Sequence, residues 1–161
     1  MIITFDDIRK HRPIALNLDD EKRLKMYIDE AETLDVMPAL GAELYKSVTD
    51  NPNNHATLLE GGYYDNDKKY FKGLKAAVSL LAYGRFILNN AVNATPFGVQ
   101  RKSALDSEPV DDKTLFRHAN EARNAGLAYL NQCLEYLNTM NEPCRKNTGR
   151  TAGKKINVIG S

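Results

Sequence analysis

The sequence predicts an all-α protein: a compact bundle of about four helices, with two long C-terminal helices, a long loop and an extended C-terminal tail. Three observations support this prediction. Apolar residues recur at three- and four-residue steps over most of the chain. Clusters of turn-forming residues separate these stretches. The 161 residues, 42% of them hydrophobic, suffice for one domain with a core, and two cysteines are too few for a disulfide framework.

The first two helices are predicted from their ends. Thr4 is a suitable N-cap for a short helix, and Pro13 ends it because the residue before a proline is disfavoured in helical geometry. A longer helix begins near Asn17, where three acidic residues follow at the positive end of the helix dipole. Its apolar stripe extends to about Leu34.

A third helix is predicted after Asp35, which is expected to cap it, with Pro38 in the first turn. It ends at the turn-forming cluster 50–54. We expect this helix and the one before it to form a helical hairpin.

A long helix is expected from about Asp67 to about Val92, after Gly61 and Gly62 break the chain. Its predicted core stripe has helical spacing and is wide enough to leave little of the helix exposed. The residues of this stripe are Tyr70, Leu74, Ala77, Val78, Leu81, Ile87 and Leu88.

The last helix is predicted to begin at Asp111 or Asp112, both suitable caps. One face carries Leu115, Ala119, Ala122, Gly126, Tyr129, Leu130, Cys133, Leu137 and Met140. Small residues are frequent in its first half, so we expect it to lie close against the long central helix.

Two segments do not follow the helical pattern. The first, 93–110, is as long as loops inside compact domains usually become. Its apolar residues Phe97, Val99 and Leu105 favour docking on a partner. The second, 141–161, has lost helical periodicity, so we divide the chain into a helical domain, 1–140, and a basic tail.

The tail combines positive charge with an aliphatic end. Its basic residues are Arg145, Lys146, Arg150, Lys154 and Lys155, against one acidic residue, and its aliphatic residues are Ile156, Val158 and Ile159. Three interpretations stay open: the aliphatic end docks on a partner as an added strand, the basic residues contact nucleic-acid phosphates, or the tail only keeps the terminus soluble.

No catalytic, cofactor or metal site is predicted. His11, His55 and His118 lie on separate elements without metal-ligand spacing, and the three Asp-Asp pairs open predicted helices, where capping explains them. The string 149–155 is too short between its glycines for a phosphate loop. Cys133 falls on an apolar stripe, so we expect it to be buried rather than nucleophilic. Neither a membrane span nor a signal peptide is expected, because no apolar run is long enough.

Several short motifs occur in a recognisable order. They are Leu40-Gly41-Ala42-Glu43-Leu44-Tyr45, Leu58-Leu59-Glu60-Gly61-Gly62, Phe71-Lys72-Gly73-Leu74-Lys75, Ala82-Tyr83-Gly84-Arg85-Phe86 and the Asn-rich stretch 89–99. A polar loop and a long amphipathic helix follow. Over residues 20–140 this pattern resembles the head-tail connector, or neck adaptor, proteins of tailed bacteriophages and prophages, particularly those of Bacteroides-type hosts.

The resemblance implies a non-enzymatic virion protein, made in the bacterial host cytoplasm. Such proteins form a ring, usually of twelve copies, beneath the portal protein, where the ring extends the DNA channel and offers a platform to the tail or a second adaptor. A ring subunit needs surfaces for two neighbours, and segments 93–110 and 141–161 are the natural candidates.

Two other functions stay open. A small nucleic-acid-binding regulator would use the basic tail and the lysines Lys68, Lys69, Lys72 and Lys75, although no helix-turn-helix spacing is evident. An enzyme of an unrecognised helical class ranks last, because it would require perturbed side chains clustered in a pocket.

Overall fold

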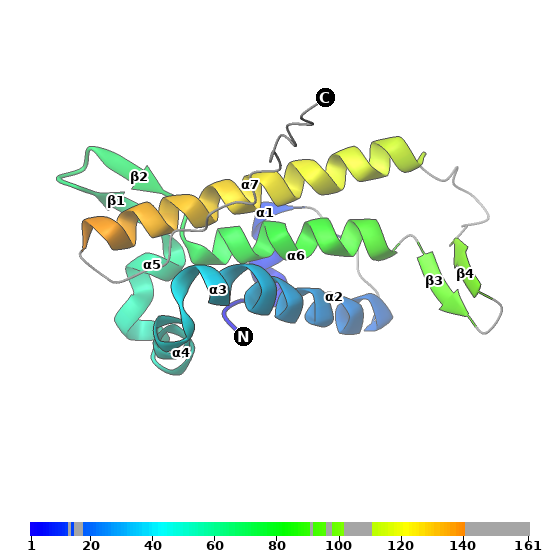
Figure 1. The fold of residues 1–161 in the computed structure, drawn as a ribbon, viewed down its shortest axis with the longest axis horizontal. Coiled ribbons are helices and arrows are strands. Elements are labelled where there is room, and N and C mark those ends of the chain that lie inside the picture. Colours follow the sequence, from blue (N-terminus) through cyan, green and yellow to red (C-terminus); the bar gives the residue numbers. More distant parts are fainter. Residues whose placement is uncertain (13, 15–17, 91, 96–97, 102–110, 141–161) are drawn as a thin grey trace, which may run out of the picture.

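The computed structural model describes the chain except residues 13, 15–17, 91, 96–97, 102–110 and 141–161. It is an elongated all-α fold with two small β-ribbons, which confirms the predicted fold class (Figure 1). Helices α6 (Leu74–Asn90) and α7 (Asp112–Thr139) lie side by side along the long axis. Helix α2 (Leu18–Ala31) packs on α6, and α1 (Phe5–His11) also contacts α6.

The predicted close approach of the two long helices is confirmed, and two glycines make it possible. A Cβ atom on Gly126 of α7 would lie 2.8 Å from Leu81 Cγ, and one on Gly84 of α6 would lie 2.9 Å from the Ala119 carbonyl oxygen. Neither distance leaves room for a side chain. At both positions the backbone of one helix therefore rests directly on its neighbour.

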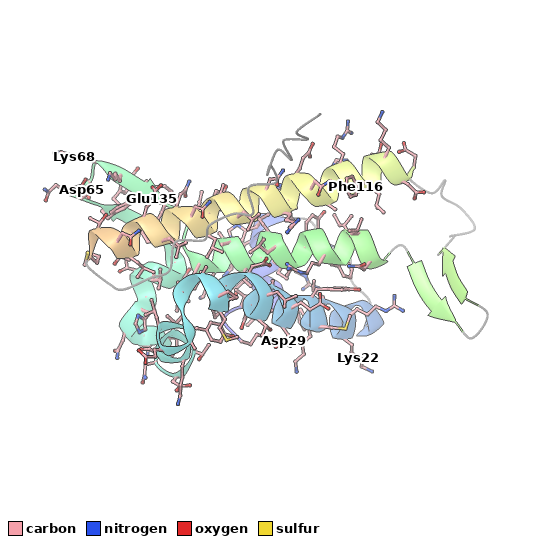
Figure 2. The ribbon with its side chains drawn as sticks, viewed as in Figure 1. Lys22, Asp29, Asp65, Lys68, Phe116 and Glu135 are labelled. Carbon is pink, nitrogen blue, oxygen red and sulfur yellow. The ribbon has the colours of Figure 1, made fainter. Side chains whose placement is uncertain are left out.

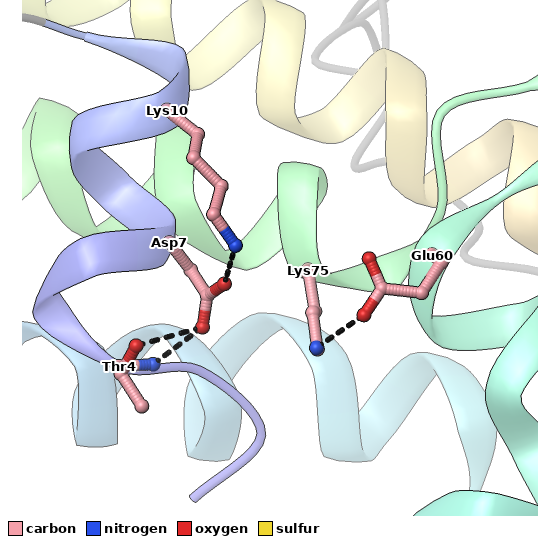
Figure 3. Close-up of polar contacts among 5 residues, drawn as sticks. All are labelled: Thr4, Asp7, Lys10, Glu60 and Lys75. Atoms are coloured by element: carbon pink, nitrogen blue, oxygen red, sulfur yellow. Dashed lines mark hydrogen bonds and ion pairs between the residues drawn. The ribbon is translucent and has the colours of Figure 1, made fainter.

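Helix α1 begins where the sequence predicts. The Asp7 carboxylate accepts hydrogen bonds from the backbone N–H and the hydroxyl of Thr4, both at 2.9 Å, and Lys10 Nζ donates to the same carboxylate at 2.9 Å (Figure 3). These bonds satisfy groups at the helix start that would otherwise lack partners. Pro13, the predicted stop, lies outside the described residues.

The predicted helix break at Asp35 is wrong. Helix α2 continues through a π-helical turn, η1 (Glu32–Val36), directly into α3 (Met37–Leu40), and Asp35 lies inside this turn rather than capping a new helix. The proline at position 38 explains the wider turn, because its ring would clash with the preceding carbonyl of a regular α-helix. The helix ends only at Gly41, whose φ of 87° favours glycine.

The predicted helical hairpin is also wrong. After Gly41, helix α4 (Ala42–Asp50) is seen nearly end-on where α2 and α3 are seen from the side, so the chain turns a corner (Figure 1). A 3₁₀ turn, η2 (Pro52–His55), and the short helix α5 (Ala56–Glu60) follow, with Leu58 and Leu59 buried.

The long helix starts later than predicted. Residues expected in its first turns form an antiparallel hairpin of β1 (Gly62–Tyr64) and β2 (Lys69–Phe71). Asp67, the expected helix start, lies in the hairpin turn. At the base of the hairpin Gly61 and Gly73 face each other, with φ of 83° and 81°, so closely that a Cβ on either would overlap the backbone around the other. This glycine pair lets the chain leave α5 and return to α6 at one point.

Most of the two predicted core stripes are buried. Ile87, Leu115 and Tyr129 are only half-buried. Tyr70, Leu88 and Met140 are 49%, 41% and 59% exposed, so their placement in the core was wrong. Tyr70 belongs to β2 rather than to a helix, and the other two lie at the ends of α6 and α7. Leu81 and Leu130, expected at the centre of the core, are both fully buried. Leu34, the expected end of the stripe on the second helix, is 64% exposed, so its placement in that stripe was wrong.

The expected loop 93–110 begins as a second ribbon. Strand β3 (Val92–Thr95) pairs antiparallel with β4 (Gly98–Arg101), and the ribbon lies beyond the end of α6, at the opposite end of the molecule from β1 and β2 (Figure 1). Helix α7 then begins after Asp111, whose carboxylate accepts the Thr114 N–H at 2.7 Å, which confirms the predicted cap. Among the described helices, none is long and apolar enough to cross a membrane.

Candidate interaction surfaces

The predicted docking and phosphate-contact residues fall mostly in parts that the structure leaves undescribed. Val99 lies in β4, opposite Ala94 of β3. The others lie outside the described residues: Phe97, Leu105, Arg145, Lys146, Arg150, Lys154, Lys155, Ile156, Val158 and Ile159. Apart from Val99, the placement of these residues is thus outside what the structure describes.

One exposed apolar cluster lies on the β1–β2 hairpin. Tyr63 and Tyr70 are cross-strand partners, 67% and 49% exposed, with ring centroids 5.0 Å apart. Lys72 Nζ lies 5.7 Å from the centre of the Tyr70 ring, a cation–π distance. Figure 2 shows Asp65 and Lys68 at the tip of the same hairpin. We call Tyr63 and Tyr70 the hairpin patch.

The opposite end of the spine also exposes apolar side chains. Leu88, in the last turns of α6, is 41% exposed, and Phe116, in the first turns of α7, is 58% exposed. Figure 2 shows Phe116 near the end of α7 that faces the β3–β4 ribbon. We call Leu88 and Phe116 the ribbon-end patch. Exposed apolar side chains thus lie at both ends of the molecule.

A buried carboxylate, which the sequence analysis missed, joins the start of the chain to the π turn. Glu32 is 2% exposed, and its carboxylate accepts hydrogen bonds from the Ile2 N–H at 2.6 Å and the Tyr45 hydroxyl at 2.8 Å. Burial and this bond raise the pKa of Tyr45 above its ordinary value. Both oxygens of the Glu32 carboxylate accept a hydrogen bond, which is typical of a structural link rather than of a reactive site.

A second polar contact fixes the same turn on α6. Arg85 Nη2 lies 2.6 Å from Asp35 Oδ2, and Arg85 Nε lies 3.7 Å from Glu30 Oε2. Because Arg85 and Asp35 are largely buried, the pair is less screened than an ion pair on the surface. These residues come from helices far apart in the sequence, so helical periodicity gave no signal for the contact.

A pocket of about 230 Å³ opens where α4, the η2–α5 segment and the end of α7 meet. Its apolar lining is Leu44, Leu58, Tyr136, Leu137 and Met140, and its polar lining is Asn54, His55 and Thr57. The Tyr136 ring stacks on Phe71, with centroids 4.5 Å apart and planes 16° apart, which holds one wall in place.

His55 in this pocket is paired with a serine. Its Nε2 lies 2.8 Å from Ser47 Oγ, so the contact ties η2 to α4. Over the described residues no carboxylate contacts His55, so the pair lacks the third group that orients a catalytic histidine. His11 lies in α1 and His118 in α7, where His118 Nδ1 is 3.7 Å from Glu121.

A second pocket, of about 260 Å³, lies between the start of the chain, α4 and α5. Lys75 of α6 and Glu60 of α5 line it and form an ion pair (Figure 3). Because the two charges neutralise each other, this pocket offers no unpaired charge from them to a ligand.

Comparison with known proteins identifies a family without assigning a function. A family model described as a family of unknown function (DUF6712) matches residues 36–151, from the end of the π turn into the tail. No curated protein matches the chain. No solved structure matches it either.

Proposed function

We propose that this chain, which belongs to the DUF6712 family of unknown function, is a structural protein of a tailed bacteriophage. In this proposal it is a head-tail connector: copies form a ring beneath the portal protein, extend the DNA channel and join the capsid to the tail or a second adaptor. It is made in the host cytoplasm and resides in the virion. No catalytic step is part of this role.

The observation that carries the proposal is the pair of different apolar patches at the two ends of the spine. A contact between the hairpin patch of one copy and the ribbon-end patch of the next is heterologous, and repeated heterologous contacts close into a ring when the rotation between copies allows it. Exposed aromatic residues are enriched at protein interfaces. The sequence motifs that resemble those of head-tail connectors are the reason for proposing that this ring is a phage connector.

Those motifs coincide with the corners of the fold. The motif around Leu40 and Gly41 spans the turn from α3 to α4, and the motif around Gly73 marks the return from the hairpin to α6. The motif containing Gly84 lies where α6 meets α7. The sequence features behind the resemblance therefore specify the shape of the subunit.

The direct test is negative-stain microscopy with mass determination on the purified chain, alone and mixed with the portal protein encoded nearby. Rings, or a defined complex with the portal, are expected. A persistent monomer that ignores the portal would overturn the proposal.

Complementary variants test the heterologous contact itself. We expect a hairpin-patch variant (Tyr63→Ser with Tyr70→Ser) and a ribbon-end variant (Leu88→Ser with Phe116→Ser) each to fail to form rings. Mixed together, they retain one intact patch each and should form a heterodimer that cannot extend. A matched control, Met26→Ser with Leu34→Ser, changes exposed apolar residues of α2 and η1, outside both patches, and should still assemble. Rings formed by either patch variant alone would contradict the model.

A second candidate, a nucleic-acid-binding regulator, is favoured by one observation. Lys69 and Lys72 lie near tyrosine rings of the hairpin, at 5.8 Å from Tyr64 and 5.7 Å from Tyr70, and single-stranded nucleic acids bind to surfaces of this composition. Against it, Lys69 is paired with Asp65 at 3.7 Å, and Lys75 with Glu60. Binding to DNA that weakens steeply with salt and depends on these lysines would move this candidate to first place.

A further inference from the structure

We propose that the pocket beside Met140 holds the aliphatic end of the chain's own C-terminal tail, Ile156, Val158 and Ile159. The pocket would then be an intramolecular docking site for a segment outside the described residues. This inference does not depend on the connector function, because it concerns the free subunit.

The size and lining of the pocket fit aliphatic side chains. Its volume, about 230 Å³, lies below the range of about 300–1,000 Å³ that is typical of small-molecule sites. Leu44, Leu58 and Leu137 give it an apolar surface. Burying one or two branched side chains there removes apolar area from water on both partners, which favours binding.

Polar groups beside this apolar surface suit a peptide backbone. Asn54, His55 and Thr57 line the same pocket, and their side chains offer donors and acceptors to an extended segment. The hydrogen bond between Ser47 Oγ and His55 Nε2 fixes the His55 ring in place. In an extended segment alternate side chains point the same way, so Ile156 and Val158 would face the pocket together while Asn157 points outward.

The place where the described chain ends identifies the occupant. Met140 lines the pocket and is also the residue from which the tail departs. Residues 141–155 connect it to the aliphatic end, and Pro143, Gly149 and Gly153 favour turns that allow the chain to come back. For a linker of this length, random-coil dimensions give a mean end-to-end distance on the order of 20 Å, which corresponds to a local concentration in the millimolar range. A second copy at ordinary concentration competes poorly with a segment held so close.

Disulfide trapping in the full-length chain tests this arrangement. The trapping variant carries Gly160→Cys in the tail, on the same side of an extended segment as Ile156 and Val158, and Thr57→Cys at the exposed edge of the pocket, with Cys144→Ser removing the native tail thiol. Cys133 can stay, because it is fully buried and burial raises the pKa of its thiol to about 12. The matched control places the second cysteine at the exposed residue Lys113, at the far end of α7.

We expect the trapping variant to form an intramolecular disulfide at least about tenfold faster than the Lys113→Cys control, at a rate independent of protein concentration. Replacing Ile156 and Val158 by Asp in the same background should lower the rate by about the same factor, because charged side chains resist burial in an apolar pocket. Far-UV circular dichroism of each variant checks that the helical domain stays folded.

Three results would overturn the proposal. Equal rates at residues 57 and 113 would mean that the tail samples the surface without docking. Disulfides between chains that increase with concentration would assign the pocket to the tail of a second copy. An unchanged rate in the Asp variant would show that the aliphatic residues do not bind there.

Discussion

At the scale of single residues, the two glycines between the long helices have a larger structural role than any polar group. Gly126 and Gly84 each bring a backbone against the neighbouring helix, where a Cβ would be 2.8 Å and 2.9 Å from its nearest neighbour. Glycine inside a helix ordinarily costs about 1 kcal/mol relative to alanine. Here the close packing that it allows offsets this cost.

We therefore predict that Gly126→Ala destabilises the protein, by about 1–3 kcal/mol, although alanine is the better helix former. The new methyl group would meet Leu81 and the carbonyl of Ala77, the latter at 3.0 Å. Urea unfolding measures the change. Asn131→Ala, at an exposed position of the same helix, is the control and should be neutral or slightly stabilising. A more stable Gly126→Ala variant would show that the helices can move apart without loss.

The carboxylate of Asp7 links stability to pH. Burial alone would raise its pKa, but the hydrogen bonds from Lys10 and Thr4 outweigh burial and lower the pKa from 3.8 to about 2. A carboxyl group with a lowered pKa in the folded state stabilises it above the unfolded-state pKa, and this stabilisation is lost as the pH falls through the folded-state value.

We predict that the wild-type chain loses on the order of 2 kcal/mol of stability through Asp7 between about pH 5 and pH 2, and that Asp7→Asn lacks this part of the pH dependence. At pH 7 the variant should be less stable by a similar amount. Urea unfolding at several pH values measures both effects. Asp6→Asn, which alters the exposed neighbour, should keep the wild-type profile; identical profiles for wild type and Asp7→Asn would refute the assignment.

At the scale of elements, the sequence predicts those structures whose signals are local. The start of α7 at Asp111, the cap of α1 and most of the stripes on the two long helices follow from caps and periodicity within a few residues. The β1–β2 hairpin could not be predicted in this way. Its strands have three residues each, and the contact of Gly61 with Gly73 becomes visible only after folding.

The π turn and the candidate surfaces also could not be predicted from local sequence signals. Pro38 signals a helix boundary, yet the helix continues because Glu32 and Asp35 find partners on the start of the chain, α4 and α6. The pocket likewise combines residues of three separate elements. The aliphatic and basic residues of the tail were recognisable from composition, but their predicted roles stay predictions.

The backbone conformation of the β1–β2 turn can be tested by substitution. Asp65, Asn66 and Asp67 all have positive φ, of 55°, 54° and 61°, in a region that β-branched residues strongly disfavour. We predict that Asp67→Val destabilises the protein by about 1–2 kcal/mol, whereas Lys68→Val, one residue later, changes stability by less than about 0.5 kcal/mol. Thermal and urea unfolding compare the two. Equal effects would mean that the turn readily adopts another conformation.

At the scale of the whole molecule, the aromatic cluster of Tyr64, Phe71 and Tyr136 connects the hairpin to the spine. Tyr64 packs edge-on against both other rings, with centroids 5.6 Å and 5.5 Å away. The hairpin is thus held against α7, and the hairpin patch keeps a fixed position relative to the ribbon-end patch. In the proposed ring, a fixed relative position of the two patches would favour closure at one size.

Deleting residues 141–161 tests whether the tail is needed for folding or for assembly. We predict that the chain 1–140 keeps its helical circular dichroism and cooperative unfolding, because it contains the hydrophobic core that the described residues form. Under the proposed connector function, assembly on the portal ring should become weaker. Under the proposed docking of the tail, amide hydrogen exchange around Leu58 should become faster once the pocket is uncovered. Undiminished assembly would exclude a docking role for the tail in the ring, and unfolding of the shortened chain would contradict the division into domain and tail.

The glycine contacts also restrict how the family can vary in length. An insertion of one residue within α6 or α7 would rotate the rest of that helix by about 100° and bring a side chain to a contact that admits only glycine. We therefore expect insertions and deletions among relatives to accumulate between residues 91 and 111 and in the tail, while both helices keep their lengths. Sequence changes at one end of the molecule would then leave the packing of α6 on α7 unaltered.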